Sequence, residues 1–174
     1  MPDKVIGMLV GPGFEDLEFW SVAMRLREEG YELLIIGSEE NTLYESKSGG
    51  LTAKSHIAAR NVDPKTLFAL TVPGGFAPDK MRRDTHMLEI IRTMDKDRKT
   101  IGFICHAGWM AASAKILQGR KCTGSLGIKD DMENAGALWV DEPAFQEGNL
   151  VWGRVVDDIP HYQKALIKAL AMQS

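Results

Sequence analysis

Residues 5–37 decide the fold and read VIGMLVGPGFEDLEFWSVAMRLREEGYELLIIG. The apolar run at 5–10 ends in Gly11-Pro12-Gly13, a pattern that predicts a buried strand followed by a turn. Apolar residues then recur at helical spacing, and these are Leu17, Trp20 and Met24. The predicted helix ends at Gly30, and a second apolar run follows at 33–37. This order predicts a right-handed strand–helix–strand unit and therefore a parallel sheet.

The same alternation continues to the C-terminus. Further apolar runs predict buried strands at residues 67–72, 101–104 and 150–152. A helical stripe follows the first of them: Met87, Ile91 and Met94. The polar residues 41–59 predict a hairpin or an excursion at the sheet edge, and an amphipathic helix starts near Pro160. We therefore expect an α/β fold with a doubly wound, mostly parallel sheet, in a single domain over residues 1–174.

Composition and charge exclude several classes of function. Apolar residues make up 44% of the 174 residues and charged residues 26%, the balance of a folded globular protein. The formal net charge of −3 supplies no basic field, so we expect no nucleic-acid partner. No apolar run approaches the ~20 residues of a membrane span, and the N-terminal residues lack the apolar core of a signal peptide. We therefore expect no membrane partner and a cytoplasmic location.

Three turns that follow predicted strands carry the candidate site: residues 11–18, 73–79 and 105–109. Ligands of an open parallel sheet bind beyond the carboxyl ends of its strands, so these turns are expected to face one crevice. Gly11-Pro12-Gly13 is half of a dinucleotide-binding fingerprint, but the third glycine is missing and acidic residues follow, which argues against nucleotide binding. The chain has four histidines: His56, His86, His106 and His161. Their spacing fits no metal site, and we expect no metal.

Cys105 is the sharpest candidate for chemistry. It follows a predicted buried strand and precedes a helix, whose N-terminus favours the thiolate and lowers the pKa of a thiol. From the residues alone two interpretations stay open: a nucleophile, or a small buried side chain, which is the usual fate of a free cysteine. The other cysteine, Cys122, has no partner nearby, so both thiols are expected to be free.

Groups near Cys105 in the sequence could act as an acid or base, or could stabilise an oxyanion. His106 suggests a Cys–His dyad, although adjacent residues at a turn usually point apart, and a structural histidine is the alternative. The backbone N–H groups of Gly75 and His106 together could form an oxyanion hole. These assignments depend on the three turns meeting at one edge of the sheet.

Three carboxylates stand at the first of these turns. Glu15 and Asp16 fit simple compensation of the helix dipole, which needs no site. Glu18 lies about one turn further in, on a different face of the helix. We therefore predict that Glu18 reaches the crevice as an acid or base with a raised pKa.

Four spaced motifs resemble the ThiJ/PfpI family, in particular its intracellular protease I branch. They are Phe14-Glu-Asp-Leu-Glu18, Val72-Pro-Gly-Gly-Phe-Ala-Pro-Asp79, Ile104-Cys-His-Ala-Gly108 and Gly127-Ile-Lys-Asp-Asp-Met-Glu-Asn-Ala-Gly136. The resemblance runs from about Val5 to the C-terminal helix. It implies a flavodoxin-like sandwich of the class I glutamine amidotransferase type, a homodimer or larger homo-oligomer, and no cofactor.

The resemblance also implies roles for single residues. Glu18 would hydrogen-bond to Cys105, and Asp79 of a neighbouring subunit would orient His106 to complete a triad. Asp79 is one methylene shorter than the glutamate usual in this branch. Two further departures bear on the substrate pocket. Ala107-Gly108 replaces the usual Gly-Pro, and Ser125-Leu126 stands near the place of a common tyrosine, while Trp109 is positioned to reshape the pocket.

Three functions stay open. The first is an enzyme of stress protection that acts on reactive carbonyls, as a glutathione-independent glyoxalase or protein deglycase, through a hemithioacetal at Cys105. The second is an intracellular cysteine peptidase with an acyl-enzyme at Cys105. The third is a redox-responsive chaperone or sensor in which Cys105 oxidises without turnover. The expected partners are accordingly a small carbonyl or a peptide or protein substrate, and other copies of the chain.

Overall fold

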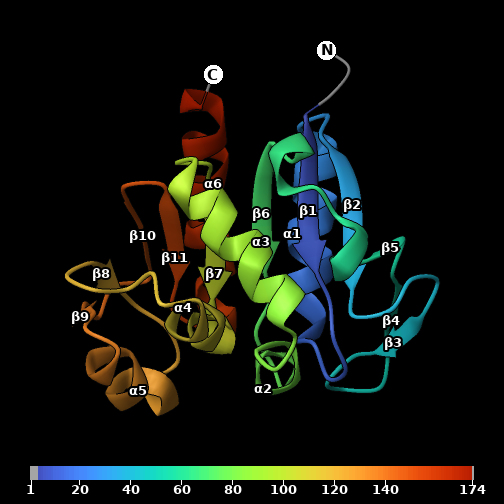
Figure 1. Ribbon diagram of the computed structural model, residues 1–174. Helices are drawn as coiled ribbons and strands as arrows, with labels where there is room; N and C mark the ends of the chain where they lie inside the picture. The colour runs from blue at the N-terminus through green and yellow to red at the C-terminus, as the bar shows by residue number, and fades with distance from the viewer. Residues whose placement is uncertain (1–3, 174) are drawn as a thin grey trace.

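A mostly parallel sheet forms the centre of the computed structural model, which describes residues 4–173 (Figure 1). Within this range the sheet has seven strands in the order β10-β11-β7-β6-β1-β2-β5. Their bounds are β1 Val5–Leu9, β2 Glu32–Gly37, β5 Ile57–Ala58, β6 Ala69–Val72, β7 Ile101–Ile104, β10 Ala144–Glu147 and β11 Leu150–Gly153. Strand β10 alone runs antiparallel to its neighbour in this sheet. β1 and β2 pair in parallel, which confirms the predicted strand–helix–strand unit.

Helices cover both faces of this sheet (Figure 1). Their bounds are α1 Asp16–Glu28, α2 Ala77–Met81, α3 Thr85–Lys96, α4 Gly108–Ala114, α5 Lys129–Asn134 and α6 Ile159–Met172. α1 and α6 lie together on one face, where Gln163 Nε2 of α6 donates to Ser21 Oγ of α1 at 2.7 Å. α3 and α4 pack together on the other face. The predicted doubly wound α/β architecture is confirmed.

The first helix buries a different face from the one that the apolar spacing indicated. Leu17 and Met24 are 51% and 55% exposed, and Trp20 is half-buried with its indole N–H donating to the Thr52 carbonyl. The buried side chains of α1 are Glu18, Phe19, Val22, Ala23 and Leu26. Two apolar stripes at helical spacing share this helix, and the stripe with the branched and small residues packs on the sheet. The stripe predicted for α3 is buried.

A hairpin of β3 Leu43–Glu45 and β4 Thr52–Lys54 confirms the excursion predicted for residues 41–59. Asp16, at the start of α1, holds its loop: the Asp16 carboxylate accepts from the hydroxyls of Ser46 at 2.7 Å and Ser48 at 2.5 Å. Lys47 N–H also donates to the Phe14 carbonyl at 2.8 Å. These bonds bring Lys47 to the turn after β1. Asp16 therefore does more than offset the helix dipole.

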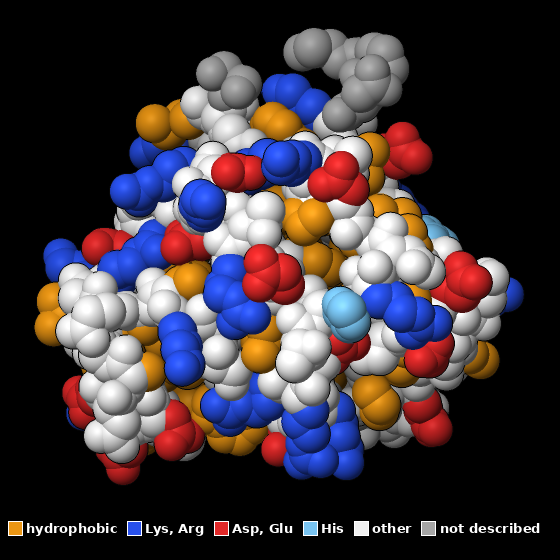
Figure 2. All heavy atoms as spheres, in the orientation of Figure 1, with side chains coloured by type: hydrophobic (Ala, Val, Ile, Leu, Met, Phe, Trp, Pro, Cys, Tyr) orange, Lys and Arg blue, Asp and Glu red, His pale blue; other side chains and the backbone are white. Residues whose placement is uncertain are grey.

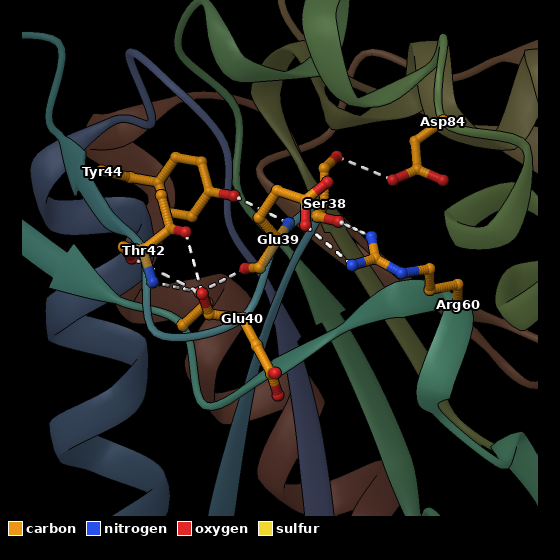
Figure 3. Close-up of polar contacts among 8 residues, drawn as sticks. Ser38, Glu39, Glu40, Thr42, Tyr44, Arg60 and Asp84 are labelled. Carbon is orange, nitrogen blue, oxygen red and sulfur yellow. Dashed lines mark hydrogen bonds and ion pairs between the residues drawn. The ribbon is translucent and has the colours of Figure 1, made fainter.

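A polar cluster at the end of β2 fixes the base of this hairpin (Figure 3). Arg60 donates to the Glu39 carboxylate at 2.8 Å and to the Ser38 carbonyl at 3.1 Å. The Ser38 hydroxyl donates to Asp84, the N-cap of α3, at 2.7 Å. Tyr44 of β3 accepts from the Glu39 N–H at 3.2 Å. The hairpin, β2 and α3 are thus tied together, so the loop that carries Lys47 rests on a fixed base.

The space-filling view in Figure 2 shows how charged side chains are distributed over one face of the protein. On the face drawn in Figure 2, basic and acidic side chains are interspersed over the helices. Among the described residues, no helix combines the length and the apolar character needed to cross a membrane. A small parallel pair, β8 Lys121–Cys122 and β9 Leu138–Trp139, lies apart from the main sheet.

Candidate active site

Cys105 stands at a sharp turn between β7 and α4. Its φ of 60° lies in the left-handed region that a non-glycine residue rarely adopts. A 3₁₀ turn over Cys105–Ala107 follows, and α4 begins at Gly108. The backbone therefore reverses within one residue, as in a nucleophile elbow, and this conformation sets the side chain at the carboxyl edge of the sheet.

Glu18 reaches this turn from α1, as predicted. Its side chain is buried, and its Oε1 accepts from the Gly74 N–H at 3.0 Å. Glu15 caps the helix by accepting from the N–H groups of Leu17 and Glu18, both at 2.8 Å. Burial, then the charge of Glu15, raises the pKa of Glu18 to about 8. Glu18 is therefore mainly protonated at neutral pH.

The Cys105 thiol lies beside Glu18, and both side chains pack against Gly74. Burial, then the charge of Glu18, raises the pKa of Cys105 to about 12, although the His106 N–H and Lys47 act in the opposite direction. The prediction of a lowered thiol pKa is therefore wrong. The seven-residue helix α4 supplies too little field to offset the loss of water around the sulfur. The thiol needs a proton acceptor to react as a nucleophile.

His106 contacts the thiol in spite of being its neighbour in the chain. Its Nδ1 lies 3.3 Å from Cys105 Sγ, and its ring packs edge-on against Trp109 with 5.3 Å between the centroids. Burial and then the charge of Lys47 lower the pKa of His106. Within residues 4–173 no carboxylate hydrogen-bonds to this imidazole. The Cys–His contact is formed, and an orienting carboxylate is not supplied by the same chain.

Two adjacent glycines, Gly74 and Gly75, lie next to the Cys105–Glu18 pair, and they differ in role. A Cβ on Gly74 would lie 2.5 Å from Glu18 Oε1, 2.9 Å from the His106 backbone nitrogen and 3.0 Å from Cys105 Cβ. Gly75 has a φ of 78°, and its N–H donates to no acceptor in the part of the chain that the structure describes. Gly75 approaches a different segment, since a Cβ there would lie 2.5 Å from the Glu15 nitrogen and from the Gly13 carbonyl oxygen, so Gly74 is the glycine that contacts the Cys105–Glu18 pair. The role of Gly75 as an oxyanion donor stays a prediction.

A cavity of about 340 Å³ opens above this site. It is lined by Pro12, Lys47, Gly75, Phe76, Asp79, Lys80, His106 and Trp109. The three predicted turns therefore do converge on one crevice. Asp79 lines it while pairing at 2.8 Å with Arg83, two residues beyond the end of α2, and its side chain is half-exposed. Lys47 has no local sequence signal, because the hairpin loop reaches the site only through long-range contacts.

The segment that contains Ser125 and Leu126 lies beside His106, on the side of the ring that carries Nε2. Leu126 is exposed, and a Cβ on Gly127 would lie 3.8 Å from His106 Nε2. A small residue therefore faces the free imidazole nitrogen. Trp109 is fixed by its indole N–H, which donates to Asp131 at 2.8 Å. Within the described residues no group of histidine, cysteine and acidic side chains is arranged to hold a metal ion.

Fold and site together define an α/β protein with a cysteine on a tight strand-to-helix turn beside a buried glutamate. Residues 4–169 match the model of the DJ-1/PfpI family, and the chain belongs to that family. It is 38% identical over 157 residues to "Deglycase PH1704" of Pyrococcus horikoshii, which covers 90% of this chain and 93% of that protein.

Two Bacillus subtilis proteins show similar likeness. "General stress protein 18" is 34% identical over 168 residues, which are 96% of this chain and 98% of that protein. "Putative cysteine protease YraA" is 31% identical over 167 residues, with the same two shares. Members of the family to which this chain is similar are thus named as deglycases, as a stress protein and as a cysteine protease.

Solved structures share the fold. A protein of Anabaena variabilis with DJ-1/ThiJ/PfpI-like and ferritin-like domains superposes with a TM-score of 0.94 at 30% identity. The match covers 97% of this chain and 48% of that one, so this chain spans about half its length. DJ-1 of Schizosaccharomyces pombe, at 16% identity, has a TM-score of 0.84 over 97% of this chain and 91% of its own, which shows the fold alone.

Proposed function

We propose that the protein is a cysteine-dependent enzyme that acts on reactive carbonyl compounds, with Cys105 as nucleophile and Glu18 as its proton partner. The observation that carries this proposal is the buried pair, in which the pKa of Glu18 is raised to about 8 and that of Cys105 to about 12. The pair loses its first proton near pH 8 and shares the one that remains. At pH 7 about a tenth of the molecules hold the singly deprotonated pair.

Addition to an aldehyde or ketone requires only this pair. The Cys105 sulfur bonds to the carbonyl carbon, the C=O π electrons move to the oxygen, and the proton held by Glu18 passes to that oxygen. A hemithioacetal forms, Glu18 is left as a carboxylate, and the net charge of the site does not change. The N–H groups of Gly75 and His106 are the proposed donors to the oxygen while its charge develops.

The cavity supports a small substrate. Its volume of about 340 Å³ is at the low end for ligand pockets, and Lys47 and Lys80 give its mouth a positive potential. A small dicarbonyl such as methylglyoxal, or its adduct with an amine, fits this size. The names of the relatives as deglycases and as a stress protein agree with this substrate class.

A cysteine peptidase is the second candidate, and the 3.3 Å contact between Cys105 Sγ and His106 Nδ1 favours it. Peptide cleavage also requires an acid that protonates the leaving amine, which falls to His106. The lowered pKa of His106 leaves it mainly neutral at pH 7. Addition to a free carbonyl compound expels no leaving group, so this function ranks first.

The proposal extends to a homodimer or larger homo-oligomer in which Asp79 of one subunit orients His106 of another. Three observations support it: the imidazole lacks a carboxylate partner within residues 4–173, Asp79 is half-exposed, and both residues border the same cavity. In such an assembly a carboxylate would enter the cavity from outside the chain.

The test compares turnover of methylglyoxal, of its adduct with an amine, and of an unfolded protein. Cys105→Ser is expected to abolish turnover, Glu18→Gln to reduce it at least ~100-fold at pH 7, and Cys122→Ala, the matched cysteine control, to retain it. Turnover of the carbonyl substrates that survives Cys105→Ser would refute the proposal. Cleavage of the unfolded protein alone would establish the peptidase. If mild peroxide oxidises the Cys105 thiol and none of the three substrates is turned over, the redox role would be established.

A further inference from the structure

Three buried polar atoms on one side of the sheet have no hydrogen-bond partner within residues 4–173. They are Oε2 of Glu18, Oγ1 of Thr71 and the hydroxyl oxygen of Tyr162. The three side chains are almost completely buried, at 2%, 2% and 1% exposure. A buried polar atom without a partner is costly, so each of these three atoms calls for a partner that the described residues do not supply.

Tyr162 lies across two glycines of the sheet. A Cβ on Gly153 of β11 would lie 2.9 Å from the Cβ, Cγ and Cδ2 atoms of Tyr162. A Cβ on Gly102 of β7 would lie 2.2 Å from the Tyr162 hydroxyl. The ring therefore crosses from β11 to β7 and carries its hydroxyl toward β6. Only glycine at these two positions leaves room for it.

Thr71 is the next side chain in that direction. It pairs in register with Gly102 across the parallel strands β6 and β7. Register partners in a parallel sheet point to the same face, so the Thr71 hydroxyl lies on the face that Tyr162 covers. Thr71 also stands three residues before Gly74, whose N–H binds Glu18.

Glu18 lies on this same face, because α1 and α6 pack side by side on it. Gln163, the neighbour of Tyr162, donates to Ser21, which is three residues after Glu18. After burial, the charge of Glu18 is the next cause that raises the pKa of Tyr162. Tyr162 and Glu18 are therefore electrostatically coupled, although no hydrogen bond joins them within residues 4–173.

We propose that the hydroxyls of Tyr162 and Thr71 position Glu18 through one internal water, donating through it to the carboxylate that forms when the Cys105–Glu18 pair loses a proton. This assignment rests on the proposed function of Glu18. A polar site with three partners suits a buried water, which typically makes about three hydrogen bonds. The two hydroxyls would stabilise the charged pair from the side opposite the substrate.

Other charged groups also face Glu18 and set the baseline of its pKa. Glu15 at the cap of α1 raises the pKa of Glu18, whereas Lys47 on the hairpin loop and the Cys105 thiol lower it. The backbone N–H of Gly74 lowers it as well. None of these contacts involves Tyr162 or Thr71, so substitutions of those two residues leave the baseline in place.

The experiment follows the infrared C=O band of the protonated carboxyl against pH in the full-length protein, a readout that needs no substrate. Tyr162→Phe and Thr71→Val are each expected to raise the midpoint by about half a pH unit or more. Because both act through one water, the double variant should shift the midpoint by less than the two single shifts combined. Tyr31→Phe is the matched control and should leave the midpoint unchanged, because its hydroxyl lies in the turn between α1 and β2, at the end of the sheet opposite Glu18.

Two failures are distinguishable. If a carboxyl C=O band that titrates near pH 8 persists in Glu18→Gln, the titrating group is not Glu18. The proposed function then fails, because it depends on Glu18 as the proton partner. If the band disappears in Glu18→Gln but keeps its midpoint in folded Tyr162→Phe and Thr71→Val, the positioning role is overturned while the function stands. A shift equally large in Tyr31→Phe would also overturn it, because the effect would then be general.

Discussion

The site has a buried part, here called the floor, of Cys105, Glu18 and Gly74, and a rim that lines the cavity, of Lys47, Phe76, Asp79 and Trp109. The floor is held by backbone contacts, and its carboxyl is 2% exposed. On the rim Phe76 is 63% exposed, and the Asp79 side chain is half-exposed. Burial therefore dominates the pKa values of the floor, whereas the rim groups meet solvent and any incoming partner. This difference predicts large, pH-linked effects from the floor and small ones from the rim.

The largest effect is expected from Gly74→Ala. The new Cβ would lie 2.9 Å from the backbone nitrogen of His106 and 2.5 Å from Glu18 Oε1, and backbone cannot move aside cheaply. We expect turnover to fall ~100-fold or more and unfolding free energy by about 1–3 kcal/mol. Gly50→Ala is the control, because its Cβ would meet only the Ser48 hydroxyl. Equal, small effects in both variants would show that the floor is not close-packed.

Glu18→Gln is expected to stabilise the protein while it impairs turnover. The pKa of Glu18 is raised from 4.5 to about 8, so the parent loses stability as pH rises between these values, by about 1.4 kcal/mol per pH unit. Glutamine carries no such penalty. The gain measured by urea unfolding should therefore be small at pH 4.5, a few kcal/mol at pH 8, and constant above. A gain that does not change with pH would show that Glu18 is not buried as an acid.

Lys47→Gln tests the rim by charge. The ammonium lowers the pKa values of both Glu18 and Cys105, so its removal should raise the pH at which the pair loses a proton. We expect turnover at pH 7 to fall less than tenfold and to recover as pH is increased. Lys80→Gln, from the same cavity, is the matched control and should leave the pH profile in place. An identical profile for both variants would remove Lys47 from the electrostatics of the site.

The smallest effect is expected from Asp79. Its pair with Arg83 is exposed and contributes less than about 1 kcal/mol, so Asp79→Ala should barely change the stability of a single chain. If Asp79 serves a neighbouring subunit, turnover falls severalfold and the oligomer loosens on dilution, as light scattering would show. Asp79→Glu should be tolerated, and Arg83→Gln should be silent. A fully active monomer at every concentration would refute the shared site.

Much of the floor could be predicted from the sequence because it depends on local order. A buried strand followed by a cysteine and a helix located the turn at Cys105, and the position of Glu18 one turn into α1 identified the buried acid. The thiol pKa could not be predicted, because desolvation depends on how α1 and β6 close around the sulfur. The adjacent glycines 74 and 75 are indistinguishable as sequence, and only the packed structure shows that Gly74 contacts Cys105 and Glu18 whereas Gly75 has the positive φ.

The rim and the outer face of α1 were less accessible to sequence reasoning. Lys47 reaches the site through bonds between the hairpin loop and α1, a long-range arrangement without a local pattern. The helix carries two apolar stripes, and spacing alone does not tell which one faces the sheet. Leu17 and Met24 illustrate this limit, because both lie on the exposed face of the helix.

The most direct test of the Cys105–Glu18 pair is the pH dependence of kcat/KM for a carbonyl substrate, in the parent and in Glu18→Gln. In the parent, kcat/KM should rise about tenfold per pH unit and level off near pH 8, because the singly deprotonated pair is the reactive form. In Glu18→Gln the first proton must leave Cys105 itself, so the rise should continue beyond pH 9. A parent profile that is already flat from below pH 6.5, and that is unchanged in Glu18→Gln, would assign the base to His106 and contradict the account.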